Sequence, residues 1–112
     1  MSDSVARFGL PAASLQALQA VLARHPGVLH ADIYGSRAKG NFRPGSDIDL
    51  SLFGDALTAQ DMLQIDREID SLDLPYKVDL SLFAHIEDPA LRAHIERVGQ
   101  VLYQRSDSGA RG

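Results

Sequence analysis

YGSRAKGNFRPGSDIDLSLF, residues Tyr34–Phe53, is the stretch of sequence that decides the fold. Gly35 and Ser36 end one strand pattern, and residues 37–46 hold two glycines, a proline and an asparagine, which predicts a short helical turn followed by a loop. From Asp47 onward, polar and apolar side chains alternate as they do in a strand. The apolar face holds Ile48, Leu50 and Leu52, and the polar face holds Asp47, Asp49 and Ser51. Two carboxylates therefore share one side of this strand.

Two further strands are predicted outward from this stretch. Residues 28–34 alternate before it, with Leu29, Ala31 and Ile33 on one face and His30, Asp32 and Tyr34 on the other. Residues 76–83 alternate after it and contain a second copy of the pentapeptide DLSLF, which first occurs at residues 49–53. We therefore expect Asp79 to occupy the same position on its strand as Asp49 does.

Three amphipathic helices complete the predicted domain. Leu15, Leu18, Val21 and Leu22 recur at helical spacing in residues 11–24, and His25, Pro26 and Gly27 follow as a stop. Thr58 and Asp61 have the spacing of a capping box ahead of a second helix. Asp88 and Pro89 are suited to begin a third, which ends at Gly99 and precedes a short extended piece at residues 101–103.

The predicted fold class is therefore α/β (α+β), a mixed sheet of three to four strands with helices packed on it. The 112 residues suit one domain, which we place at residues 1–103, followed by a tail at 104–112 that we expect to be disordered. A net charge of −4 gives little attraction to nucleic acid, so no direct nucleic-acid partner is expected. The absence of cysteine, of a leader pattern and of a long apolar run predicts a cytoplasmic protein without membrane contact.

The acidic side chains indicate a metal site. Asp47 and Asp49 have Cα atoms roughly 6.5 to 7 Å apart on one strand face, and Asp79 adds a third carboxylate. Oxygen ligands without histidine or cysteine suit Mg²⁺ rather than Zn²⁺. The backbone at Gly35 and Ser36 is suited to bind an anion, and nearby cations could neutralise phosphates: Arg37, Lys39 and Arg43.

In its order of strand, Gly-Ser, loop and Asp-x-Asp, the sequence resembles the minimal nucleotidyltransferases of the DNA polymerase beta superfamily. The resemblance covers residues 33–103, including KVDLSLF at 77–83 and DPALRAHIERVGQVLY at 88–103. It implies a polymerase-beta-like fold and two magnesium ions, both bound by Asp47 and Asp49 and one of them also by Asp79. A nucleoside triphosphate would bind against Gly35 and Ser36. Asp79 would help to activate a hydroxyl that attacks the α-phosphorus, releasing pyrophosphate.

The resemblance also implies a partner. The chain leaves no room for the acceptor-binding domain of larger members, and small members of this kind act as antitoxins beside a HEPN-domain toxin. The leading hypothesis is transfer of AMP from ATP to a hydroxyl, a tyrosine above all, of a HEPN ribonuclease toxin. The alternatives are a non-catalytic antitoxin that neutralises its partner by binding, and a small-molecule nucleotidyltransferase that acts as a homodimer. Exposed apolar residues expected on the last helix would suit either kind of partner.

Other polar residues carry no prediction of chemistry. The four histidines lack the spacing of a zinc site, so solvated or capping roles are expected for them. Tyr34, at the end of a strand, is expected to pack rather than to contact a nucleotide. The acidic residues of the second helix are expected to form a solvated face.

Overall fold

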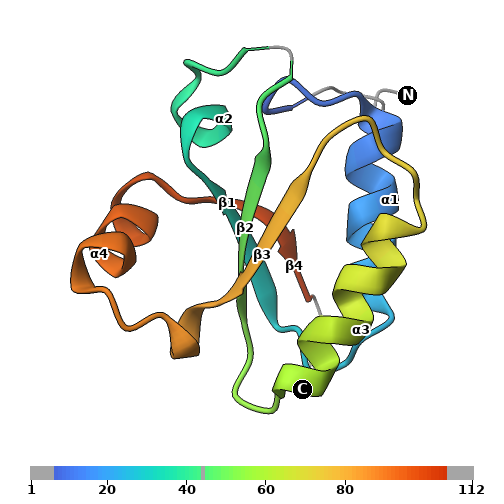
Figure 1. Ribbon diagram of the computed structural model, residues 1–112, viewed down its shortest axis with the longest axis vertical. Coiled ribbons are helices and arrows are strands. Elements are labelled where there is room, and N and C mark those ends of the chain that lie inside the picture. The colour runs from blue at the N-terminus through green and yellow to red at the C-terminus, as the bar shows by residue number, and fades with distance from the viewer. Residues whose placement is uncertain (1–6, 44, 106–112) are drawn as a thin grey trace.

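Four strands form one mixed sheet in the computed structural model of the protein, which describes residues 7–43 and 45–105 (Figure 1). The strands lie in the order β3-β2-β1-β4, with β1 antiparallel to both β2 and β4, and with β2 parallel to β3. Their bounds are β1 His30–Tyr34, β2 Ile48–Phe53, β3 Val78–Leu82 and β4 Gln100–Gln104. The predicted mixed sheet is confirmed, with β1 and β2 in its centre and β3 and β4 at its edges.

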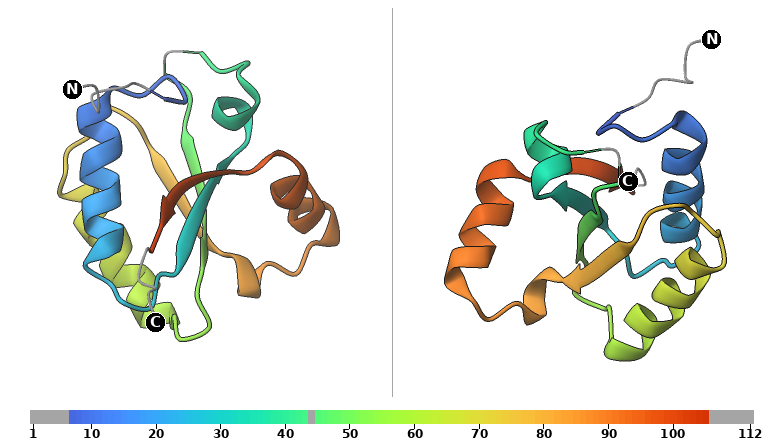
Figure 2. Two further views of the ribbon diagram at one scale, coloured as in Figure 1. Left: turned by 180° about the vertical axis from the view of Figure 1, so that it is seen from behind. Right: turned by 45° about the horizontal axis from the view of Figure 1, so that its top comes forward.

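Helices lie on both sides of the sheet. They are α1 Ala12–Ala23, α2 Ser36–Lys39, α3 Ala59–Asp70 and α4 Pro89–Val98, and a 3₁₀ turn, η1 Phe83–His85, follows β3. Figure 2 shows α1 and α3 together on one side of the sheet and α4 on the other. In the described part of the chain, no helix combines the length and apolar character needed to cross a membrane.

The hydrophobic core lies between the sheet and the pair α1 and α3. The apolar side chains that alternate along the strands point into it, because side chains of a strand point to its two faces in turn. Burying them removes apolar surface from water, the main favourable contribution to folding. Fully buried core residues include Leu18, Leu22, Ile33, Ile48, Leu50, Leu52 and Ile65. The opposite face of the sheet carries the polar side chains that form the site described below.

Local sequence signals fix where the helices begin. The Thr58 hydroxyl accepts a hydrogen bond from the Asp61 N–H at 3.1 Å, and the Asp61 carboxylate accepts one from the Thr58 N–H at 3.0 Å. This confirms the predicted capping box, which satisfies two backbone donors that a helix start leaves free. At α4, Asp88 accepts from the Ala90 N–H at 3.0 Å, and Pro89 occupies the first helical position.

The first strand begins later than the alternation predicted. The Val28 N–H donates to the His25 carbonyl at 2.9 Å, so residue 28 still belongs to the turn after α1, and its side chain is fully buried. Leu29, expected to point into the core, is instead 51% exposed. The strand begins at His30, so Leu29 precedes it, whereas Ala31 and Ile33 are fully buried as the alternation predicts.

Two expectations about the C-terminal third also need correction. Large exposed apolar side chains among the described residues are Leu29, Leu63 and Val101, and none of them lies on α4. Gln104, the first residue of the expected tail, pairs with His30, and the Arg105 guanidinium donates to carbonyls at residues 23, 25 and 28. The rest of the expected tail, residues 106–112, lies outside the described residues.

Candidate active site

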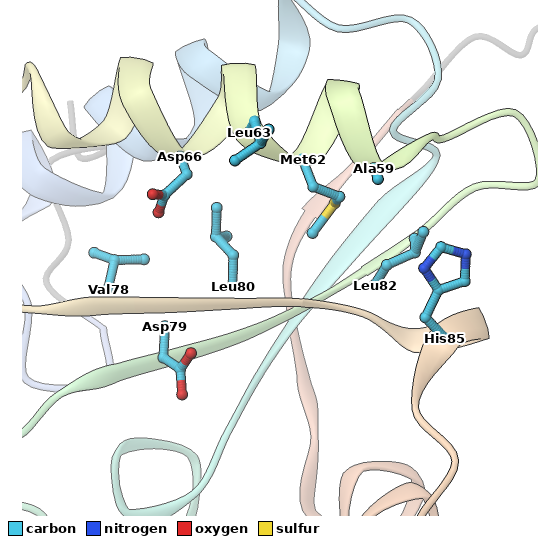
Figure 3. A pocket seen from close by; sticks show the side chains of 9 residues that line it. All are labelled: Ala59, Met62, Leu63, Asp66, Val78, Asp79, Leu80, Leu82 and His85. Carbon is cyan, nitrogen blue, oxygen red and sulfur yellow. The ribbon is translucent and has the colours of Figure 1, made fainter.

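Three polar residues lie side by side across three strands on the face of the sheet opposite α1 and α3. Asp49 of β2 pairs with Tyr34 of β1 on one side and with Asp79 of β3 on the other. Neighbouring strands are about 4.8 Å apart, so the carboxylates of Asp49 and Asp79 come from adjacent backbone positions. Figure 3 shows the Asp79 side chain pointing to the opposite side of β3 from Val78 and Leu80. The sheet thus brings together two of the three predicted carboxylates.

The turn between β1 and α2 lies directly against Asp49. Gly35 has a φ of +79°, a conformation that side chains other than hydrogen rarely adopt. A Cβ atom at this position would lie 2.5 Å from the Asp49 Oδ2 atom, closer than van der Waals contact allows. Glycine is therefore required here both by the backbone conformation and by the neighbouring carboxylate.

The surroundings of Asp49 disfavour the charged form of its carboxylate. Partial burial raises its pKa, and the negative charges of Asp79 and then Asp47 raise it further, while the nearby His94 lowers it. Each of these effects acts on the charged form of the carboxylate: burial removes its hydration, and like charges repel it. A cation bound here would relieve both costs.

Asp47 and the basic loop residues are at the surface. Asp47 immediately precedes β2 and is exposed, with its charge acting on Asp49. Ser36 begins α2 and is half-buried, whereas Lys39 at the end of α2 and Arg43 in the loop are exposed. Their exposure leaves these two cations able to meet a solvent-borne anion.

Arg37 has a different environment from the other cations. Its side chain is only 2% exposed, and it donates to the Ser46 carbonyl at 3.0 Å and the Phe8 carbonyl at 2.9 Å. Its guanidinium also lies over the rings of Phe42 and Tyr76, at 5.2 and 4.9 Å from their centroids. These contacts support a role in holding the loop that leads to Asp47 rather than direct contact with phosphate.

Two other residues of this face, Tyr34 and His94, were not predicted from the sequence to belong to the site. Tyr34 is buried, and its ring meets the ring of His94 edge to face, with centroids 6.2 Å apart. Burial raises the pKa of Tyr34, a hydrogen bond with Ser81 lowers it, and the charges of Asp49 and Asp79 raise it. His94 comes from α4, far from the Gly-Ser and Asp-x-Asp positions in sequence, so no spacing rule could have placed it beside them.

The chemistry of the donors fits a magnesium ion, although the side chains do not form a closed cluster. In residues 7–43 and 45–105, no three His, Asp or Glu side chains are close enough together to hold a metal as they lie. The carboxylates of Asp47, Asp49 and Asp79 nevertheless interact electrostatically at Asp49. Hard oxygen donors of this kind are those that Mg²⁺ prefers, and an acidic face beside a glycine turn suits a metal-bound phosphate.

Comparison with known proteins identifies the family of the chain. The sequence profile of the family described as Polymerase beta, Nucleotidyltransferase matches residues 16–108, which is most of the chain. No curated protein sequence matches it.

Solved structures share the fold. A chain of a toxin-antitoxin crystal structure with AMP-PNP is 20% identical, with a TM-score of 0.65 over 82% of this chain and 74% of that one. A chain of the MntA-HepT toxin-antitoxin structure is 18% identical, with a TM-score of 0.60 over 83% and 72%. A chain from the complex of the tri-AMPylated Shewanella oneidensis HEPN toxin with its MNT antitoxin is also 18% identical, with a TM-score of 0.61 over 83% and 71%.

Proposed function

The chain belongs to the polymerase beta nucleotidyltransferase family, and from this premise we propose that it transfers AMP from ATP to a hydroxyl of a partner HEPN ribonuclease toxin. The preferred acceptor is the hydroxyl of a tyrosine. The modification inactivates the toxin, so the chain acts as an antitoxin, and it does so in the cytoplasm. The observation that carries the proposal is the position of Asp49, between the Gly35 turn and Asp79. The similarity in fold to chains of toxin-antitoxin complexes supports the choice of partner.

The proposed reaction is a substitution at the α-phosphorus of ATP. The acceptor oxygen forms a bond to this phosphorus while the bond to pyrophosphate breaks, and the hydroxyl proton passes to a base. We assign Asp79 as that base, because it is exposed at an edge strand where an acceptor can approach, whereas Asp49 is half-buried. Gly35 and Ser36 would bind the phosphates through their backbone, and Lys39 would offset the charge of the departing pyrophosphate.

Asp47, Asp49 and Asp79 are the residues that would hold two magnesium ions. When bound, Mg²⁺ supplies positive charge beside the entering and leaving oxygens. The raised pKa of Asp49 supports this assignment, because three carboxylates that repel one another in the free protein gain most from a cation. Thermal unfolding should therefore show a rise in Tm on adding Mg²⁺ and ATP, as binding to the folded state alone requires.

Intact-mass measurement tests the proposal directly. The purified chain, Mg-ATP and the protein product of the neighbouring gene would be mixed, and the proposal predicts that this product is a HEPN protein that gains one or more AMP units. Asp47→Asn and Asp49→Asn should each abolish the gain, a loss of at least about a hundredfold, since each removes charge that acts in the transition state. Asp55→Asn is the matched control, because Asp55 is an exposed acid in the loop after β2, and it should leave the gain unchanged.

The other outcomes identify the alternatives. A stable complex with no mass gain for any nucleoside triphosphate would favour an antitoxin that acts by binding alone. AMP transfer to a small molecule without the partner would favour a small-molecule nucleotidyltransferase. Mass gain that survives Asp49→Asn would contradict the assignment of the site.

A further inference from the structure

The two edges of the sheet differ in how their backbones are protected. At β4, the Arg7 guanidinium donates to the Val101 carbonyl at 3.1 Å, and the Gln19 amide donates to the Leu102 carbonyl at 2.9 Å. Within residues 7–43 and 45–105, we find no side chain that hydrogen-bonds to the backbone of β3. An uncovered edge is a template for pairing with another strand, and proteins usually block such edges.

The direction of the free backbone groups can be deduced from the register. The Lys77 carbonyl accepts from the Ile48 N–H of β2 at 2.8 Å, so odd-numbered residues of β3 direct their backbone groups to β2. The even-numbered residues Val78, Leu80 and Leu82 therefore direct theirs outward. Their side chains point to the same side as α3, where they are at least partly buried (Figure 3).

An apolar groove lies between this free edge and α3. It has a volume of about 570 Å³, and its walls are formed mainly by apolar side chains from the two elements (Figure 3). Leu63, on the α3 side, is 60% exposed, the largest exposure among the large apolar side chains described. The apolar residues of the walls are Ala59, Met62, Leu63, Val78, Leu80 and Leu82.

The rim of the groove is acidic. Asp66 lines the groove and also an adjoining hollow of about 250 Å³, which Asp70 and Lys77 line as well. The Asp79 carboxylate points to the other face of β3, so the two hollows carry the carboxylates of Asp66 and Asp70 beside one lysine amine and the ring of His85. This charge favours an occupant with basic side chains.

We propose that the groove between α3 and β3 binds an extended segment of a partner protein, which adds as a fifth strand to β3. The side chains of the segment that face α3 would be apolar where they pack on Leu63 and Leu80, and basic towards Val78, where they would meet Asp66 and Asp70. Backbone hydrogen bonds along a sheet edge supply affinity in this mode of recognition, and pockets for alternate side chains supply specificity. The proposal goes beyond nucleotidyl transfer and does not depend on it.

Charge argues against a second copy of the chain as the occupant, and composition argues against the C-terminal stretch. A second copy placed symmetrically on β3 would bring Asp66 and Asp70 towards the same residues of its partner, and each chain carries a net charge of −4. The C-terminal stretch at residues 106–112, SDSGARG, has no large apolar side chain to fill the groove.

Selection from a random peptide library tests the proposal. Twelve-residue peptides displayed on phage would be selected on the immobilised chain, synthesised and titrated while the backbone amide resonances of the chain are recorded. The recovered peptides should carry apolar residues and at least one lysine or arginine at every second position, on one face of the strand, and the largest shifts should fall on residues 78–82. Asp66→Asn should weaken binding, and added salt should do the same.

Two variants of the groove and one matched control test whether the peptides bind in the groove. Leu63→Glu and Leu80→Pro should each weaken peptide binding by about tenfold or more, the first by removing an apolar contact and the second by removing an outward N–H. Leu29→Glu changes another exposed leucine outside the groove and should alter binding by less than about twofold.

Three results would overturn the proposal. These are recovery of no peptide, recovery of peptides that bind Leu63→Glu as tightly as the unchanged chain, and sedimentation of the chain alone as a dimer that Leu63→Glu dissociates. The last would mean that a second copy occupies the groove.

Discussion

The pentapeptide DLSLF occurs in a central strand and again in an edge strand, and the two copies have different surroundings. In the β2 copy, Leu50, Ser51 and Leu52 are all fully buried. In the β3 copy, Leu80 and Ser81 are only half-buried, and Phe83 leaves the strand to begin η1. The two copies lie next to each other in register, so local sequence is held constant while the neighbours change.

The difference shows that the position of a strand in the sheet decides how buried and how accessible identical residues are. Asp49 has strands on both sides and the Gly35 turn against its carboxylate, and burial raises its pKa. Asp79 has a strand on one side only and is exposed. The central copy thus supplies a constrained, partly desolvated acid, and the edge copy supplies an acid that an incoming group can reach.

The largest expected difference concerns the first leucine of each copy. Leu50→Ala should lower the free energy of unfolding by about 2–5 kcal/mol, because it leaves a cavity in a fully packed core. Leu80→Ala should cost roughly 1 kcal/mol, since Leu80 is already partly in contact with water. Urea unfolding of the two variants checks this, and equal losses would show that the edge position is as tightly packed as the centre.

Replacing the buried serine of the central copy should raise stability, whereas replacing its leucine lowers stability. The Ser51 hydroxyl is fully buried and has no hydrogen-bond partner among the described residues. An unpaired buried hydroxyl is unfavourable, so Ser51→Ala should raise the free energy of unfolding by about 1 kcal/mol. Ser81→Ala should give no such gain, because Ser81 is only half-buried and its hydroxyl can hydrogen-bond with water. The same urea measurement decides, and a loss of stability in Ser51→Ala would contradict the comparison.

The aspartates should differ in how stability depends on pH. Because the pKa of Asp49 is raised by folding, the folded state holds this proton more tightly than the unfolded state does. The resulting stability is fully present below the usual carboxyl pKa of about 4 and is lost as pH rises through the raised value. In the metal-free protein, Asp49→Asn should therefore raise Tm at pH 7 relative to the unchanged chain, and this gain should shrink towards pH 4.

Asp79→Asn is the companion measurement. It removes one of the charges that raise the pKa of Asp49 but leaves the larger effect, the burial of Asp49, in place. Its gain in Tm at pH 7 should therefore be smaller than that of Asp49→Asn. A larger gain from the edge variant would mean that charge repulsion outweighs burial at this site.

The smallest expected effect is a shift in the titration of Tyr34. Ser81 lowers the pKa of Tyr34 through its hydrogen bond, so Ser81→Ala should raise that pKa. Ser51→Ala should leave it unchanged. Ultraviolet absorbance against pH measures the titration, and a Tyr34→Phe variant separates Tyr34 from the other two tyrosines of the chain.

Much of the architecture could be predicted from local patterns. The capping box at Thr58, the helix start at Asp88 and the strand that carries Asp49 each depend on residues within a few positions of one another, and the structure has all three. The start of β1 was predicted less well, because Val28 still belongs to the turn after α1 and the strand begins only at His30. The prediction that Arg37 binds phosphate also came from its local position alone. In the structure its side chain is buried and donates a hydrogen bond to the Ser46 carbonyl in the following loop.

The sequence by itself determined the strands, the helices and the order of Gly-Ser, Asp-x-Asp and the later aspartate, because side-chain periodicity and turn chemistry act over a few residues. It also determined that the same five residues would occur twice, of which the second copy keeps four in its strand. Only the tertiary structure decided which copy is central, that Asp79 lies beside Asp49, and that His94 and Tyr34 join the same face. The physical reason is that burial, charge repulsion and the free edge of β3 arise from neighbours distant in sequence, whose pairing the local pattern does not contain.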